Sequence, residues 1–150
     1  METERKLSEY ISLSKKIDDS KLERKIKVGI LSSFTLNGLD ETLHVKCSEI
    51  DIGYRSYAAG YNQFNQEILD SNSNLYNFSP DITFLIMDVR SLLGKIFYYP
   101  YSISSSERKQ VVEKKINELK NLIVQFKKNS NSKLIISNFS VPSYSSNGLI

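Results

Sequence analysis

The sequence has little of what metal centres, disulfide-stabilised domains and membrane spans are built from. Its 150 residues include one cysteine, Cys47, one histidine, His44, and no tryptophan. One cysteine cannot form an internal disulfide and fits a reducing compartment, so we expect a cytoplasmic protein. One cysteine and one histidine do not make a conventional zinc site, and we expect no metal in this chain. The longest apolar run, residues 84–87, is far shorter than the ~20 residues of a membrane-spanning helix.

The sequence also lacks a large excess of charge of one sign. Lys and Arg number 20 and Asp and Glu 17, which gives a net charge of +3. That balance is too even to indicate nucleic-acid binding, so we expect neither a nucleic acid nor a membrane as partner. The charged start of the chain, residues 1–6, is followed by no apolar block and does not resemble a secretory signal. With 40% hydrophobic and 25% charged residues, the composition is that of a globular domain.

Helical and strand patterns alternate along the chain, which is typical of an α/β protein. Residues 1–25 are expected to form an amphipathic N-terminal helix and a linker, and residues 26–150 a single α/β domain. The expected strands are 26–31, 50–57, 82–87 and 134–136. The expected helices are 36–47, 61–69 and 107–128, with loops at 71–77 and 94–106.

The segment 82–87 is apolar throughout, as in a central parallel strand that is covered on both faces. We therefore predict a three-layer sandwich with a mainly parallel sheet. Residues 141–150 have the composition of a loop, whereas a doubly wound domain normally continues with another helix and strand. The sheet is thus expected to be incomplete at its C-terminal side and the chain to be a fragment of a longer protein.

Ligands of open α/β sheets bind at the C-terminal ends of the strands. Ser33 follows the first expected strand and precedes a helix, so its hydroxyl is a candidate nucleophile near a helix N-terminus. Alternatively Ser32, Ser33 or Thr35 caps that helix, which is the commoner role. A serine nucleophile needs a positioned base. His44 is the single histidine, and an isolated histidine on a predicted helix is more often structural or exposed than catalytic. A Ser/His/Asp triad therefore cannot be assembled from this chain.

The next two strand ends offer further candidates. Gly60 could direct its backbone N–H at an oxyanion, or could simply be a loop glycine. Asn62 and Gln63 could donate hydrogen bonds to a ligand or stabilise their own loop. Asp88 and Arg90 follow the central strand and could position a polar substrate, or could form a surface ion pair or a helix cap.

Asn138, after the last expected strand, could bind a ligand or an adjacent loop. The aromatic segment 98–101 could be a partner-binding surface, because aromatic residues are enriched at interfaces, or could pack over the end of the sheet. Lys114, Lys115, Lys127 and Lys128 could dock an acidic partner, although an ordinary solvated helix face is the commoner outcome.

Five motifs follow one another along the chain: Ile30-Leu31-Ser32-Ser33-Phe34-Thr35-Leu36, Gly60-Tyr61-Asn62-Gln63-Phe64-Asn65-Gln66-Glu67-Ile68-Leu69, Ser73-Asn74-Leu75-Tyr76-Asn77-Phe78-Ser79-Pro80-Asp81, Asp88-Val89-Arg90 and Ser137-Asn138-Phe139-Ser140-Val141-Pro142. Their order is more informative than any one of them, and from about Ile26 to Ile150 it resembles that of FkbH-like proteins.

This resemblance implies a cytoplasmic bacterial protein whose N-terminal domain is similar to SGNH hydrolases, with a flavodoxin-like fold. A C-terminal haloacid-dehalogenase-like domain follows in the family, and better-known members form glyceryl-acyl carrier protein in polyketide-type pathways. Their magnesium and phosphoryl chemistry belong to that C-terminal domain and its Asp-x-Asp-x-Thr motif. This sequence has no such motif, so no cofactor is expected in this chain. The partners implied are an acyl carrier protein and the C-terminal catalytic domain.

Compared with SGNH hydrolases, Ser33 matches the block I serine and Gly60 the block II glycine. Asp88 stands where those enzymes have the block III asparagine, and an ionised carboxylate cannot donate to an oxyanion. The block V Asp-x-x-His is not found in this chain. The resemblance implies Ser33 as the catalytic acyl acceptor or nucleophile, and the residues around it as substrate-binding: Thr35, Gly60, Asn62, Gln63, Asp88, Arg90 and Asn138. The alternative is a non-catalytic module that docks a carrier protein or a partner domain.

Overall fold

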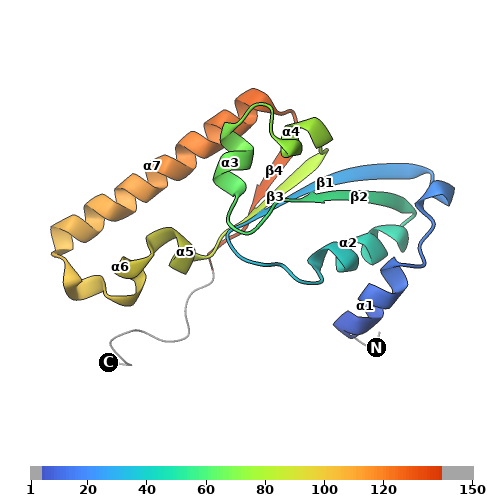
Figure 1. Ribbon diagram of the computed structural model, residues 1–150, viewed down its shortest axis with the longest axis horizontal. Coiled ribbons are helices and arrows are strands. Elements are labelled where there is room, and N and C mark those ends of the chain that lie inside the picture. Colours follow the sequence, from blue (N-terminus) through green and yellow to red (C-terminus); the bar gives the residue numbers. More distant parts are fainter. Residues whose placement is uncertain (1–4, 140–150) are drawn as a thin grey trace.

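A four-stranded, wholly parallel sheet forms the centre of the computed structural model, which describes residues 5–139 (Figure 1). The strands are β1 (Arg24–Ser32), β2 (Ile52–Ala58), β3 (Ile82–Ile86) and β4 (Lys133–Ile136). They lie in the order β2-β1-β3-β4, and all three pairings are parallel. The predicted α/β class and parallel sheet are confirmed, and each predicted strand is present with its ends within two residues of those predicted.

The second half of β1, residues 28–32, is buried because helices cover both faces of the sheet there. On one face Val28 and Ile30 pack with Tyr54 of β2 beneath α2 (Leu39–Ser48). On the other face Leu31 and Leu85 belong to a second cluster. This alternation follows from the two-residue repeat of a strand, which turns successive side chains to opposite faces.

The second cluster is covered by α3 (Phe64–Leu69), α4 (Asn74–Phe78) and α7 (Ser105–Asn129), and Figure 1 shows these three helices together on one side of the sheet. Phe126 of α7 is fully buried in it. α1 (Leu7–Ser14) lies against α2 on the opposite side. The molecule is therefore a helix–sheet–helix sandwich, as predicted.

The long helix α7 has a clear start in the sequence. The Ser104 hydroxyl accepts a hydrogen bond from the Glu107 N–H, and the Glu107 carboxylate accepts one from the Ser104 N–H. This reciprocal capping box satisfies two donors that the first turn leaves without an intrahelical partner. The helix predicted over 107–128 is confirmed and is slightly longer at both ends.

Two predicted loops contain short helices instead. In the segment 71–77, Ser73 caps α4, and Leu75 is completely buried while its N–H donates to Glu67 Oε2 at 2.9 Å. The polar composition of the segment concealed a single helical turn that is held by these tertiary contacts. The segment 94–106 likewise contains α6 (Lys95–Tyr98) and a 3-10 turn, η2 (Pro100–Ser102), after α5 (Val89–Leu93).

The N-terminal segment packs onto the domain. Arg5 forms an ion pair with Glu49 just after α2, and Leu7 lies close to Gly38, which precedes that helix. A 3-10 turn, η1 (Asp19–Lys21), then leads into β1. Within residues 5–139 no helix combines the length and apolarity needed to cross a membrane. The loop expected over 141–150 lies outside the described residues.

Candidate functional site

The direction of chain progression reverses at β1. From β1 the chain moves to β2 on one side, and it then crosses to β3 on the other side. In open α/β sheets such a reversal opens a crevice at the C-terminal ends of the two strands concerned, and ligands bind there. Ser33 directly follows β1, and Asp88 is the second residue after the end of β3. The topology thus brings two of the predicted site residues together.

Ser33 is almost completely buried, with 1% of its surface exposed. Its N–H donates to the Ile86 carbonyl at 3.1 Å, and its Oγ accepts a hydrogen bond from the Asp88 N–H at 2.8 Å. That bond uses a lone pair of the hydroxyl oxygen and not the hydroxyl proton. The preceding hydroxyl, that of Ser32, is instead engaged within its own turn by the N–H and carbonyl of Phe34.

Ser33 lines a pocket of about 110 Å³, which we call the Ser33 pocket. Its walls combine amide, hydroxyl and charged groups with apolar side chains from α3, α5 and α7. The other lining residues are Asn62, Phe64, Asn65, Ser91, Leu92, Lys115, Glu118, Leu119 and Leu122. Such a mixture of an apolar wall and a few polar groups is typical of small-molecule sites.

The charged groups of this pocket come from α7. Lys115 Nζ donates to Glu118 Oε2 at 2.8 Å, and the two side chains are 35% and 44% exposed. The hydrogen bond from Lys115 is the main factor that lowers the pKa of Glu118, so this carboxylate is ionised at neutral pH. A ligand would meet a donor and an acceptor of opposite charge side by side, which suits hydroxyl groups better than a single net charge.

Sequence reasoning missed three of these residues, Asn65, Ser91 and Glu118, and considered Lys115 only as a docking residue. Asn65 lies in one of the family-like motifs, and Glu118 is three residues from Lys115, a spacing at which helical side chains meet. Both signals could have been used. The position of α7 over the strand ends, however, depends on the crossover between β3 and β4.

Asp88 and Arg90 form a local ion pair beside the site. The Asp88 carboxylate caps α5, accepting from the Arg90 N–H at 3.1 Å and from Arg90 Nε at 2.7 Å. Asp88 therefore reaches Ser33 through its backbone N–H, while its carboxylate is turned to Arg90. Neither residue is among those that line the Ser33 pocket.

Gly60, Asn62 and Gln63 belong to one turn before α3. The Gln63 N–H donates to the Gly60 carbonyl at 3.1 Å, and a Cβ at Gly60 would lie 2.5 Å from Gln63 Oε1. The absence of a side chain at Gly60 makes room for Gln63. Asn62 has a left-handed backbone with φ of 55° and is the member of this turn that lines the Ser33 pocket.

Thr35 and Asn138 are not among the residues that line the Ser33 pocket. Thr35 lines a different pocket of about 190 Å³, together with Ser32, on the α2 side of β1. Asn138 is exposed after β4. Of the predicted residues, the structure brings Asn62 and the Asp88 backbone to Ser33 and leaves these two elsewhere.

The single histidine is occupied at another place. His44 Nε2 lies 3.0 Å from Asp19 Oδ2, and its ring stacks on Tyr54 at 5.6 Å between centroids. This cluster joins α2, η1 and β2 on the α2 side of the sheet. Within residues 5–139, no group of three or more His, Cys, Asp or Glu side chains is arranged to hold a metal ion.

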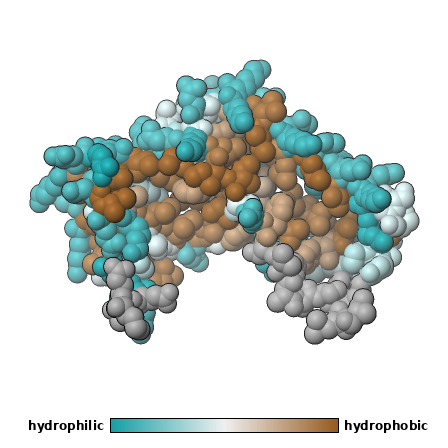
Figure 2. Space-filling view, turned by 180° about the vertical axis from the view of Figure 1, so that it is seen from behind, coloured by the Kyte–Doolittle hydropathy of each residue, from teal (hydrophilic) through white to brown (hydrophobic). Residues whose placement is uncertain are grey.

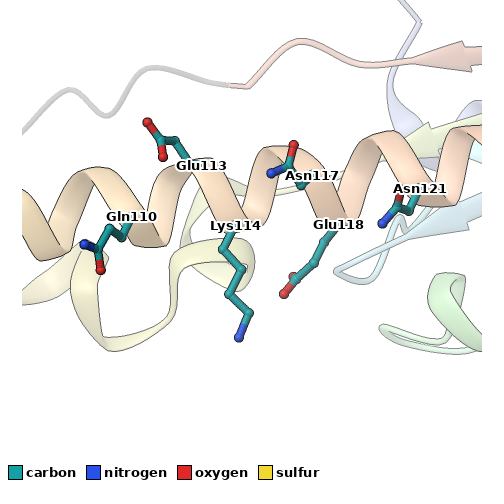
Figure 3. Close-up of a pocket in the computed structure, with 6 residues that line it drawn as sticks. All are labelled: Gln110, Glu113, Lys114, Asn117, Glu118 and Asn121. Atoms are coloured by element: carbon teal, nitrogen blue, oxygen red, sulfur yellow. The ribbon is translucent and has the colours of Figure 1, made fainter.

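A shallow hollow of about 500 Å³ runs along the outer side of α7 (Figure 3). In Figure 3 Lys114 and Glu118 extend to the same side of the helix, whereas Glu113 lies on the other. Glu118 borders both this hollow and the Ser33 pocket. Of the two neighbouring lysines, Lys114 faces the open surface hollow, and Lys115 lines the Ser33 pocket.

Comparison with known proteins agrees with this architecture. The sequence model of the family described as "FkbH, N-terminal domain" matches residues 27–142. No curated protein matches the chain. A solved structure described as the N-terminal part of the protein BF1531 from Bacteroides fragilis, containing a phosphatase domain complexed with Mg, has a similar fold, with a TM-score of 0.73 at 19% identity. The similarity covers 93% of this chain and 35% of that one, so this chain spans about a third of the neighbour's length.

Proposed function

This chain belongs to the FkbH N-terminal domain family, and from that premise we propose that the Ser33 pocket receives a small hydroxylated acyl group, such as glyceryl, in carrier-protein-dependent biosynthesis. Ser33 is the acyl acceptor in this proposal. The observation that carries it is the Ser33 hydroxyl, held by the Asp88 N–H at 2.8 Å in a polar pocket at the reversal point of the sheet. At ~30 Å³ for each water molecule, 110 Å³ corresponds to about four waters, which suits a short acyl group.

The chemistry requires an activated donor, because no histidine of the described residues adjoins Ser33. With an acyl thioester, Ser33 Oγ attacks the carbonyl carbon, the C–S bond breaks, and the hydroxyl proton ends on the departing thiol. Asn62 and Asn65 supply N–H donors for the carbonyl oxygen in the role of an oxyanion hole. Lys115 and Glu118 offer a donor and an acceptor to the hydroxyls of the acyl group.

The experiment is an acyl-loading assay on the chain itself. The protein is incubated with the glyceryl thioester of N-acetylcysteamine, and its intact mass is measured over time. The wild-type chain is expected to gain the mass of one acyl group, and Ser33→Ala to gain none. Ser32→Ala is the matched control, because Ser32 is adjacent but faces the other side of β1. Equal loading of wild type and Ser33→Ala would reject Ser33 as the acceptor.

A second candidate function, a non-catalytic module that docks an acidic carrier protein, is favoured by one surface. Tyr98, Tyr99 and Tyr101 are 47%, 68% and 69% exposed, on the segment that leads into the lysine-rich helix α7. Exposed aromatic residues near positive charge are typical of an interface for an acidic partner.

The two candidates are separated by Lys114→Glu, because Lys114 lies on the outer hollow. A docking module predicts that this change weakens binding of an acyl carrier protein severalfold, while Ser33→Ala leaves binding unchanged. Lys16→Glu, at an exposed lysine just after α1 on the opposite side of the sheet, is the control. Calorimetric titration at low ionic strength gives the affinities, and equal affinity for all four proteins would dismiss the docking function.

A further inference from the structure

We propose that the pocket lined by Thr35 on the α2 side of β1 is a separate binding site for a small organic ammonium cation. We name it the Asp40 pocket. It is lined by Ile30, Ser32, Phe34, Thr35, Leu36, Asp40, Ala58, Ala59 and Tyr61. The proposal does not depend on acyl transfer, since Ser32 and Ser33 lie on opposite sides of β1.

The pocket exists because small side chains end two neighbouring strands on this face. Ser32 ends β1, and Ala58, which pairs with Ile30, ends β2. The helix α2 begins only at Leu39, so it leaves these strand ends uncovered. The resulting space of about 190 Å³ corresponds to about six water molecules at ~30 Å³ each.

The lining carries one charged group, the Asp40 carboxylate. Tyr54, which is 5% exposed, donates its O–H to Asp40 Oδ1 at 2.8 Å and so fixes the carboxylate in place. One oxygen is thereby oriented by the protein, and the other can receive a ligand. The N-terminus of α2 carries a partial positive charge of about one half, which the full negative charge of the Asp40 carboxylate exceeds. Glu41 adds a second negative charge in the same turn, so the local charge is negative.

Two aromatic residues, Phe34 and Tyr61, complete the site, and Tyr61 is 71% exposed. Aromatic faces attract cations through their quadrupole, and quaternary ammonium groups are recognised in this way. None of the chain's 20 lysines and arginines lines the pocket. A carboxylate, aromatic rings and an apolar floor without a basic residue together select a positively charged group with a short aliphatic body.

The test compares two probes of the same shape, choline and its neutral isostere 3,3-dimethyl-1-butanol. Each is titrated into the isotopically labelled chain, and amide chemical shifts are followed by NMR. We expect choline to saturate with shifts at Leu36, Ala58 and Ala59, and the isostere to bind at least tenfold more weakly. Equal binding of both probes would show that the pocket does not select a positive charge, which would reject the proposal. Absence of choline binding would also overturn it.

Asp40→Asn supplies the second arm, because the amide oxygen can still accept the Tyr54 hydrogen bond and the fold is kept. This variant is expected to bind choline at least tenfold more weakly and to leave the isostere unaffected. Glu41→Gln is the matched control, since it removes a charge from the same helical turn outside the pocket. If Glu41→Gln weakens choline binding as much as Asp40→Asn does, the cause is the overall negative charge of this helical turn, and the site is rejected. The comparison of the two probes on the wild-type chain tests the proposal even if a variant fails to fold.

Discussion

At the scale of single residues, the consecutive serines at the end of β1 show how one strand serves two sites. Ser33 turns toward α7 and accepts the Asp88 N–H, whereas Ser32 turns toward α2 and bonds within its own turn. The alternation of strand side chains separates them. A serine pair that looks redundant in the sequence therefore supplies one hydroxyl to each side of the sheet.

Ser33→Ala is expected to lower the free energy of unfolding as well as to remove acyl loading. The substitution leaves the Asp88 N–H without its acceptor in a largely buried place, which costs about 1–3 kcal/mol. Urea denaturation followed by circular dichroism measures this loss. Ser91→Ala, at an exposed serine on the rim of the same pocket, is expected to stay within about 0.5 kcal/mol of wild type. Equal stability of all three proteins would contradict the structural role of the Ser33 hydroxyl.

Tyr57 makes the stability depend on alkaline pH. Burial, and then its hydrogen bond to Glu67, raises the pKa of Tyr57 to about 12 from the ordinary value of 10.0. Above pH 10 the unfolded chain loses this proton before the folded chain does, so stability falls as pH rises toward 12.

Tyr57→Phe should flatten part of that fall, because phenylalanine has no proton to lose. The variant also loses the hydrogen bond to Glu67, about 1 kcal/mol at neutral pH, so its stability starts lower and declines less. Denaturant titrations at a series of pH values measure both effects. Tyr99→Phe, at an exposed tyrosine, serves as control. If wild type and Tyr57→Phe lose stability in parallel between pH 10 and 12, the linkage to Tyr57 is wrong.

At the scale of elements, α7 is decisive because it covers one core and also reaches over the Ser33 pocket. Leu122 and Phe126 are buried in the core, and Lys115 and Glu118 line the pocket one or two turns earlier. A change that frays the start of α7 should therefore affect the pocket before it affects the core.

Ser104→Ala removes the N-cap of this helix and is expected to cost about 1 kcal/mol. Because the loss is at the first turn, amide hydrogen exchange should quicken in the N-terminal turns of α7 and stay unchanged near Phe126. Ser105→Ala is the matched control, since Ser105 is already the first helical residue and makes no capping bond. If the N-terminal turns of α7 exchange no faster in Ser104→Ala than in wild type, the cap does not stabilise this end of the helix.

The elements that could be predicted from the sequence are those with a repeated pattern. The apolar segment 82–87 and the long helix over 107–128 were predicted, whereas α4 was not, because its single turn is held by Leu75 and Glu67 through tertiary contacts. At the site, Ser33 and Asn62 could be placed because they follow strands. Thr35 could not be assigned to the other pocket, since its side of β1 depends on how the turn after Ser33 is folded.

At the scale of the whole molecule, the sheet has two unlike edges. On the β2 side, α2 and η1 lie against the sheet. On the other side, no described strand pairs with the outer edge of β4, where Ile135 and Ile136 are 38% and 39% exposed. Figure 2 shows hydrophobic residues gathered across the middle of the rear face, below a mostly hydrophilic rim. Parallel sheets are normally covered on both faces, and an open edge offers unpaired backbone groups to another chain.

We therefore expect the chain to associate with itself at high concentration, and Ile135→Lys to reduce that association. A charge on an edge strand opposes edge-to-edge pairing because it would be buried without a partner. Since Ile135 is already partly exposed, the free energy of unfolding should change by no more than about 0.5 kcal/mol. Light scattering over a concentration series measures the association. Val124→Lys places the same charge at a 61% exposed residue of α7, away from the edge, and should leave association unchanged. If both variants reduce association equally, net charge is the cause, and the β4 edge is not the contact.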